Sequence, residues 1–313
     1  MAKKYDITAL GEILIDFVPD GTDSFGDLRL IRKAGGAPLN MLATASKAGL
    51  RTAFIGKVGD DLPGKFLAET VRKCNIDDSY LKTDPEHNTT LAFVELDQNG
   101  DRKFSFYRSF GADRFITQDD IDIGLLSESS VFHFGSLSLI DEPSFSATLY
   151  ALKKAKENRC VITYDPNYRQ PLWKSSALAS QRIALPLHYV DIIKLSIEEL
   201  EMISNGKGVD AVFSQGVKII LVTDGGKGAD LYFNGQSAHI PAINVKAIDT
   251  TGAGDIFFGT FVSQFVVRNL PIDELSFDEL KIFAQNAVYI SGKSTEKYGA
   301  IASIPDIIRQ FNN

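Results

Sequence analysis

The stretch Asp249-Thr250-Thr251-Gly252-Ala253-Gly254-Asp255 joins a glycine-flanked turn to a carboxylate, and an apolar segment follows it directly. Large apolar residues recur in that segment at helical spacing: Phe257, Phe258, Phe261, Val262 and Phe265. This spacing predicts a helix that is buried on one face. Unpaired amides at a helix start favour phosphate oxygens, and glycines let a ligand approach the main chain. We therefore predict an anion cradle formed by the amides of Gly252, Ala253 and Gly254.

Asp255 follows this cradle directly, and its carboxylate would repel a bound phosphate. A functional role such as accepting a proton from an attacking hydroxyl would explain its position. The alternative is that Asp255 only stabilises the helix start, where acidic side chains are common. The stretch by itself leaves both interpretations open.

The composition limits the classes of function. The 313 residues include 33 Lys and Arg against 40 Asp and Glu, a net charge of −7, which argues against nucleic-acid binding. A polyanionic ligand would need backbone donors, a few cations and a metal ion. Cys74 and Cys160 are far apart, so neither a disulfide framework nor a zinc site is indicated. The N-terminus does not resemble a signal peptide and no segment is typical of a membrane span, so we expect a cytoplasmic protein without a membrane partner.

Strand and helix patterns alternate after residue 116. Apolar runs at 131–134, 160–164, 191–195 and 217–222 are separated by helical segments, which is typical of a parallel sheet with helices on both faces. Polar residues follow these strands, where such sheets bind ligands. These residues are Asp165–Arg169, Lys194, Ser196, Glu199 and Thr223–Gly228. No repeat or linker divides the chain, so we expect a single domain over residues 1–313.

The N-terminal region has a second candidate site. Asp16 lies where an apolar strand gives way to a polar loop, and Gly35 and Gly36 precede a helix that begins near Pro38. Asn40, one turn into that helix, both donates and accepts hydrogen bonds, as sugar hydroxyls require. The alternative for Asn40 is an ordinary helix-start residue.

Segments 89–96 and 103–107 alternate around Asp97-Gln98-Asn99-Gly100, and Asn-Gly is a strong hairpin signal. With a pairing segment near residues 28–32, this hairpin predicts a small β lid, built from insertions at about 12–34 and 88–112. Arg108 lies at the end of the hairpin, either as a substrate-facing cation or as a solvated surface residue.

Two glycine-lysine motifs are rejected as phosphate-binding P-loops. Gly59–Lys65 is followed by Phe66 instead of a hydroxyl residue, and Ser291–Thr295 lacks the upstream glycine, because Ala287 occupies that position. Signatures for hydride transfer, serine hydrolysis and zinc hydrolysis are also missing from the sequence.

Two longer motifs carry a resemblance to a known family. GGAPLN at 35–40 with GKVGDD at 56–61, and DTTGAGDIFFGTF at 249–261, resemble the two signatures of the PfkB (ribokinase-like) carbohydrate kinases. The resemblance extends over essentially the whole chain. It implies a three-layer α/β/α domain with a mostly parallel central sheet and a small β-sheet lid. It also implies transfer of the γ-phosphoryl group of ATP, with Mg²⁺, to a sugar hydroxyl.

Within this family, GGAPLN combined with Phe106-Tyr107-Arg108 and Asp165–Trp173 most resembles fructokinases, which implies phosphorylation of D-fructose at O6. The resemblance also leaves open a kinase for 2-keto-3-deoxygluconate, whose carboxylate Arg108 and Arg169 would bind. A nucleoside or aminoimidazole riboside kinase and a catalytically silent sugar-sensing protein are further alternatives. The edge strands of the lid are compatible with a homodimer, and a monomer is equally compatible.

Roles for individual residues follow from the resemblance. Asp255 matches the catalytic base, and Gly252, Ala253 and Gly254 match the anion hole. The sugar-binding positions are Asp16, Gly35, Gly36, Asn40, Arg108 and Arg169. The ATP-binding positions are Ser196, Glu199, Thr223, Gly225, Gly228 and Asn286, with Glu199 holding Mg²⁺ through water and Ser196 replacing the family's Asn. Positions of a potassium site are Asp249, Thr251, Gly299 and Ser303.

Overall fold

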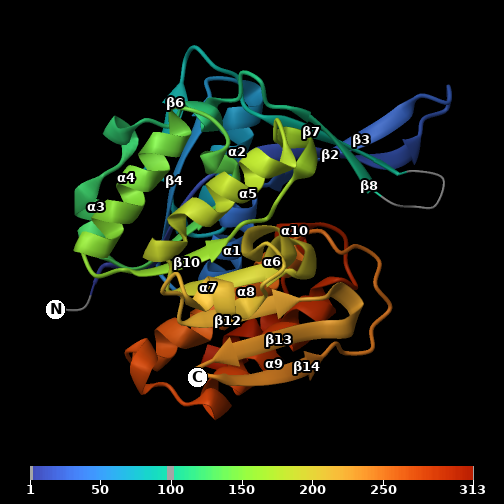
Figure 1. The fold of residues 1–313 in the computed structure, drawn as a ribbon. Helices are drawn as coiled ribbons and strands as arrows, with labels where there is room; N and C mark the ends of the chain where they lie inside the picture. The colour runs from blue at the N-terminus through green and yellow to red at the C-terminus, as the bar shows by residue number, and fades with distance from the viewer. Residues whose placement is uncertain (1–2, 97–101, 313) are drawn as a thin grey trace.

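The computed structural model describes residues 3–96 and 102–312, and a large sheet forms its centre (Figure 1). Within those residues, ten strands make up the sheet in the order β14-β13-β12-β11-β10-β9-β1-β4-β5, with β6 paired to β4. The strands are β1 (Tyr5–Leu10), β4 (Thr52–Gly59), β5 (Ile76–Asp77), β6 (Leu81–Asp84), β9 (Ser129–Gly135), β10 (Val161–Asp165), β11 (Ile192–Ser196), β12 (Ile219–Thr223), β13 (Gly228–Phe233) and β14 (Gln236–Pro241).

The pairing is parallel from β4 through β12, and it becomes antiparallel from β12 to β14. Parallel neighbours need long crossover connections, and helices supply most of them. Because the parallel strands point the same way, the residues that follow β1, β9, β10, β11 and β12 meet at one edge of the sheet.

Helices cover both faces of the sheet. On one face lie α1 (Ala37–Lys47), α2 (Leu62–Lys73), α8 (Ala253–Arg268) and α9 (Phe277–Ser294), which share one apolar core with strand residues such as Ile7 and Val131. The other face packs against a second core, to which α3 (Ile123–Ser127), α4 (Ser144–Glu157), α5 (Ser176–Ala184), α6 (Ile197–Ser204) and α7 (Val209–Phe213) contribute. The predicted three-layer α/β/α fold with a mostly parallel sheet is confirmed. No helix in the described ranges has both the length and the apolar character needed to cross a lipid bilayer.

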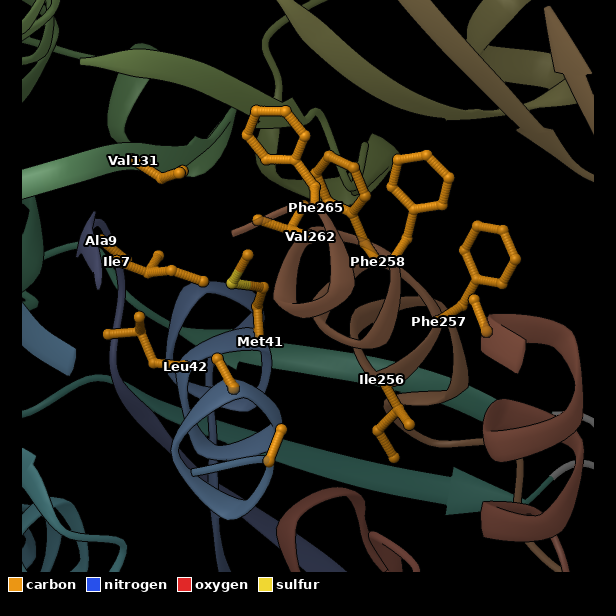
Figure 2. Close-up of a cluster of buried hydrophobic side chains, with 14 of the residues drawn as sticks. Ile7, Ala9, Met41, Leu42, Val131, Ile256, Phe257, Phe258, Val262 and Phe265 are labelled. Carbon is orange, nitrogen blue, oxygen red and sulfur yellow. The ribbon is translucent and has the colours of Figure 1, made fainter. Parts of the chain in front are cut away.

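Helix α8 is more deeply buried than its sequence pattern predicts. Every residue from Asp255 to Phe265 is buried, so the expectation of a helix buried on one face is wrong. The reason is that α8 lies between α1 and α9 and also packs against the sheet. Figure 2 shows Phe258 and Phe265 projecting from one side of this helix and Ile256 from the opposite side, with Met41 of α1 nearby. A helix that is apolar all round provides a rigid base for its first turn.

A separate four-stranded sheet projects from the main body (Figure 1). Its order is β3-β2-β7-β8, formed by β2 (Leu14–Thr22), β3 (Leu28–Gly35), β7 (Leu91–Leu96) and β8 (Arg102–Tyr107). The β7–β8 pair is antiparallel, as the hairpin pattern predicts, whereas the turn at Asp97-Gln98-Asn99-Gly100 lies outside the described residues. The strands fall within the two segments expected to form the lid. That this sheet closes over a ligand stays a prediction.

Candidate active site

The first turn of α8 lies at the carboxyl edge of the large sheet. Gly252 precedes the helix with a φ of 74°, a conformation that favours glycine, and a Cβ there would clash with Ala300. The Ala253 amide donates to the Thr250 carbonyl at 3.2 Å. Among the described residues, the amides of Gly252 and Gly254 have no such backbone partner. Two N–H groups at the positive end of a long helix dipole can therefore bind an anion.

Asp255 lies one residue beyond this turn, with 8% of its surface exposed. Its Oδ2 atom accepts a hydrogen bond of 2.8 Å from Nδ2 of Asn40 in α1. Burial, and then the negative charge of Asp165, raise the pKa of Asp255 to about 6, against the opposing effects of Asn40, Lys194 and Arg169. A carboxylate with this pKa is ionised at neutral pH and is a better base than an exposed aspartate.

Asn40 also presents an acceptor to the site. In the part of the chain that the structure describes, its Oδ1 is a buried polar atom with no hydrogen-bond partner. Leaving such an atom unsatisfied costs about 1–3 kcal/mol, so it indicates a missing donor. A ligand hydroxyl that donates to Oδ1 of Asn40 would lie beside the Asp255 carboxylate. The structure therefore brings these two predicted residues together.

Asp16 and the glycine pair lie at the base of the small sheet. In the β2–β3 register Asp16 is opposite Lys33, and the Asp16 carboxylate turns toward Gly35. A Cβ at position 35 would overlap that carboxylate, so the close approach requires glycine. Gly36 then precedes α1, which carries Asn40. The predicted sugar-binding residues Asp16, Gly35, Gly36 and Asn40 are thus adjacent to one another.

Arg108 is not a solvated surface residue. It is 4% exposed, its Nε donates to Oδ2 of Asp113 at 2.7 Å, and its Nη2 donates to the Leu137 carbonyl at 3.1 Å. The interpretation of Arg108 as a solvated surface residue is therefore wrong, because its guanidinium is anchored where the small sheet joins the body. Substrate binding by Arg108 stays a prediction, and it would have to occur from within this ion pair.

The end of β10 and the loop that follows it bring two further charges to the site. Arg169 is half-buried, and its positive charge favours the ionised form of Asp255. Asp165 is 2% exposed and its Oδ2 accepts a bond of 2.8 Å from Nζ of Lys194 in β11. The sequence places Asp165 and Lys194 at this sheet edge, but their pairing was not predicted, since it depends on the spatial order of β10 and β11.

Ser196 and Glu199 form a capping box at the start of α6. Oγ of Ser196 accepts from the Glu199 amide at 3.1 Å, and Oε2 of Glu199 accepts from the Ser196 amide at 2.7 Å. The other Glu199 oxygen accepts from the amide of Tyr168 at 2.7 Å, which ties α6 to the loop after β10. Glu199 is therefore held rigidly close to Asp165 and Lys194.

The donor set fits a magnesium ion that is carried by a nucleotide. No cluster of three His, Cys, Asp or Glu side chains suited to a metal ion occurs within residues 3–96 and 102–312. Mg²⁺ prefers oxygen ligands and keeps several waters, and it commonly binds through phosphates and one or two carboxylates. The buried carboxylate of Glu199 is suited to hold such an ion through water.

A cavity of about 600 Å³ adjoins the first turn of α8. The predicted nucleotide residues Thr223, Gly225 and Gly228 line it, as do Ala253 and Gly254 of the anion cradle. Two further segments of the wall are residues 242–245 with 247, and one face of α9. The sequence analysis missed both of these segments. Only the α9 segment carries a recognisable signal: Val288, Ser291, Gly292 and Thr295 follow helical spacing and include two small residues.

Asn286 does not line this cavity. Its Nδ2 donates to Oε1 of Gln264 in α8 at 2.6 Å, and it lies on a different face of α9 from Val288, Ser291 and Gly292. The position of Asn286 therefore does not support a nucleotide contact. The rejected motif at Ser291–Thr295 contributes to the wall instead, but as the end of a helix and not as a P-loop.

The residues predicted for a potassium site are partly assembled. Oδ1 of Asp249 accepts from the Thr251 amide at 2.7 Å, and Oδ2 accepts from the Gly299 amide at 2.8 Å. These residues line a cavity of about 20 Å³ together with Lys33. Ser303 is not part of that lining, and its Oγ donates to the Ala300 carbonyl at 2.9 Å.

Comparisons with known proteins identify the family of the chain. Residues 4–307 match the pfkB family carbohydrate kinase model. A probable fructokinase-2 of Arabidopsis thaliana is 37% identical over 306 residues, which cover 96% of this chain and 92% of that protein. A fructokinase from Xylella fastidiosa with bound ATP has a TM-score of 0.88 at 26% identity, covering 96% of this chain and 95% of that one. A fructokinase double mutant from Vibrio cholerae, in a form with fructose, ADP and potassium bound, has a TM-score of 0.83 at 26% identity, with both chains fully covered.

The chain belongs to the pfkB family of carbohydrate kinases. Its predicted membership of this family, its fold and its enzyme class are thereby confirmed. The roles of the individual site residues stay predictions.

Proposed function

We propose that this protein is an ATP-dependent fructokinase that phosphorylates D-fructose at O6. The observation that carries the proposal is the position of Asp255. Its buried carboxylate lies one residue beyond Gly254, which lines the cavity of about 600 Å³, and it is bonded to Asn40 beside Asp16 and Gly35. A nucleotide in the cavity and a sugar against Asn40 would meet at this carboxylate. The similarity to fructokinases supports fructose as the sugar.

Asp255 would act as the general base. Its ionised carboxylate accepts the proton of the attacking sugar hydroxyl as that oxygen bonds to phosphorus. Asn40 holds the carboxylate through its 2.8 Å hydrogen bond and accepts a second sugar hydroxyl at Oδ1. A positioned base of this kind contributes about 10²–10⁴-fold to the rate.

The amides at the start of α8 would stabilise the charge on the transferring group. Phosphoryl transfer passes through a loose transition state whose charge lies on the equatorial oxygens, so catalysis depends on alignment and fixed dipoles. When bound, Mg²⁺ neutralises negative charge on the phosphates. Glu199 would hold that ion through water, and closure of the small sheet would exclude water as a competing acceptor.

The experiment that tests this function is ATP consumption by the purified protein across a panel of acceptors. The panel contains fructose, glucose, mannose, ribose, 2-keto-3-deoxygluconate and a nucleoside, with Mg²⁺ present. We expect kcat/KM for fructose to exceed the others by at least about tenfold, which is about 1.4 kcal/mol of differential transition-state binding. A preference for the keto acid would contradict fructose and assign Arg169 to its carboxylate. Failure with every acceptor would favour a silent sugar-sensing protein.

A monovalent cation beside Asp249 is part of the proposal. A cavity of about 20 Å³ lined by Asp249, Thr251 and Gly299 has room for one ion or water molecule. The ammonium of Lys33 lies near the same point, 3.1 Å from where a Cβ of Gly299 would be, so K⁺ would share the Asp249 charge with it. Turnover in potassium chloride compared with tetramethylammonium chloride measures the effect. Equal turnover in both salts would contradict a role for K⁺.

We also propose a homodimer through the small sheet in a cytoplasmic enzyme. The edge strand β3 exposes Leu28, Leu30 and Ile31 beyond a third of their surfaces, and the opposite edge strand β8 exposes Tyr107. An apolar edge of this kind favours pairing with another strand. Sedimentation measures the oligomeric state, and cell fractionation tests the location.

A further inference from the structure

Lys194 is a buried cation at the point where the phosphoryl group would be transferred. It lies in β11 with 7% of its surface exposed, and its Nζ is 2.8 Å from Oδ2 of Asp165. A Cβ built on Gly254 would be 3.1 Å from the same Nζ. The ammonium group therefore lies between the Asp165 carboxylate and the amide cradle at the start of α8.

The surroundings of Lys194 are strongly negative. Asp165, Glu199 and Asp255 all act on its charge, and together they raise its pKa although burial lowers it. Lys194 therefore remains charged at neutral pH. Arg169 is a second cation whose charge acts on Asp255.

The nucleotide cavity itself offers no comparable charge. Among the described residues, its lining includes neither lysine nor arginine, although a nucleotide triphosphate carries several negative charges. The ammonium of Lys194 is adjacent to Gly254, which lies at one end of this lining. A γ-phosphoryl group bound at the Gly254 amide would be in reach of this ammonium.

We propose that Lys194 is a catalytic residue whose ammonium donates a hydrogen bond to an equatorial oxygen of the transferring γ-phosphoryl group. The inference rests on the proposed kinase function. The sugar oxygen forms a bond to the γ-phosphorus, the bond from that phosphorus to the bridging oxygen breaks, and its electron pair leaves with ADP. The hydroxyl proton passes to Asp255, whereas Lys194 keeps its proton and supplies fixed positive charge.

The competing explanation is that Lys194 only neutralises the buried Asp165. Breaking a buried ion pair by removing one partner is strongly destabilising, so loss of activity in Lys194→Met would not by itself separate the two explanations. Transition-state stabilisation has a distinct signature: it affects a bound transition-state mimic more than a bound ground state.

The test compares the affinity of Lys194→Met for ADP with aluminium fluoride against its affinity for ADP alone, in the presence of fructose and Mg²⁺. We expect the aluminium fluoride complex to weaken by at least about thirtyfold more than the ADP complex, since donors to such charge are worth about 10²–10³-fold in rate. Lys194→Arg, which keeps the charge, should recover part of the affinity. Lys218→Met is the matched control, because Lys218 forms only an exposed pair with Asp273.

An equal weakening of both complexes would overturn the inference. Full recovery of kcat in the double variant Lys194→Met with Asp165→Asn would overturn it too, because a neutral pair would then suffice. These outcomes differ from failure of the proposed function. In that case the wild-type protein itself would transfer no phosphoryl group from ATP to any sugar.

Discussion

Asp255 and Glu12 are two buried carboxyl groups whose pKa values are raised, to about 6 and about 7. Asp255 is held by Asn40 at the first turn of α8. Glu12 precedes β2 and is 3% exposed, with its Oε1 accepting from the Ala37 amide at the start of α1. Ionising either buried carboxyl group costs free energy, so both lower stability as the pH rises, and Asp255 also controls how activity depends on pH.

The activity should rise with pH as Asp255 loses its proton. Because the base must be ionised, kcat should increase tenfold per pH unit below the pKa and level off above it. The negative charge of bound ATP raises the pKa further, so the midpoint should lie at or above about 6. Turnover measured from pH 5 to 8 with both substrates saturating checks this. A profile that is flat through this range would contradict a base at position 255.

The substitution Glu12→Gln should change how stability depends on pH. The folded-state pKa of Glu12 is about 7 against an ordinary value of 4.5, so the folded state binds more protons between these values. The contribution of Glu12 to stability should therefore be fully present below pH 4.5 and be lost as the pH rises through 7, by about 3 kcal/mol. Burial raises the pKa of Glu12 and the charge of Asp113 adds to this shift, whereas the hydrogen bond from the Ala37 amide and the charge of Arg108 oppose it.

In Glu12→Gln the part of the decrease that comes from Glu12 should be missing, since the amide oxygen still accepts from Ala37 and carries no charge. Urea unfolding of both proteins at pH 5 and pH 8 measures the difference. If the two proteins lose the same stability between those pH values, the carboxyl group of Glu12 is not the cause.

At the scale of elements, α8 and the turn before it act as one unit. In Gly252→Ala the alanine would have to adopt the left-handed conformation of the glycine. Its Cβ would also clash with Ala300, so the turn must move. We expect a loss of more than about 2 kcal/mol in unfolding free energy and a fall in kcat of at least about tenfold, since left-handed strain alone costs about 1–2 kcal/mol.

Gly206→Ala provides the matched control for this prediction. Gly206 has a φ of 76°, close to that of Gly252, but nothing lies within 4 Å of its Cβ position. The Gly206→Ala variant should therefore lose stability only by the strain energy and keep the wild-type kcat. Similar kcat values in both variants would show that the turn does not position the reacting groups.

The elements were more predictable than their contacts. Apolar runs and helical spacing depend on the local sequence, and they correctly located strands such as β9 and β12 and the helix α8. The extent of burial of α8 was not predictable, because it depends on α1 and α9 packing against opposite sides. Asn286 shows the same limit: the resemblance assigns it to the ATP site, but the packing of α9 on α8 directs it to Gln264.

At the scale of the whole molecule, the order of strands in the sheet decides which side chains meet. The pairing of β10 with β11 brings Lys194 to Asp165, and α1 brings Asn40 to Asp255 over a separation of 215 residues. The resemblance assigns both Asn40 and Asp255 to the active site, whereas no sequence feature paired Lys194 with Asp165. Arg108 and Asp113 are close in sequence, yet their burial depends on where the small sheet joins the body.

The proposed homodimer makes a prediction at this scale. Ile31 lies on the edge strand β3 with 42% of its surface exposed, so Ile31→Lys should place a charge in the interface and convert a dimer to a monomer. Sedimentation equilibrium measures the mass. Leu185→Lys, at a site with 45% exposure outside the small sheet, should leave the mass unchanged. A wild-type protein that sediments as a monomer would contradict the dimer.

The central claim is that Asp255 removes the proton from the sugar hydroxyl, and Asp255→Asn tests it most directly. The measurement pairs kcat for fructose phosphorylation with calorimetric binding of fructose by the same variant. We predict that kcat falls by at least about a hundredfold while fructose still binds, because the amide keeps the shape of the carboxylate but cannot act as a base. A variant that binds fructose and turns over at nearly the wild-type rate would contradict the mechanism.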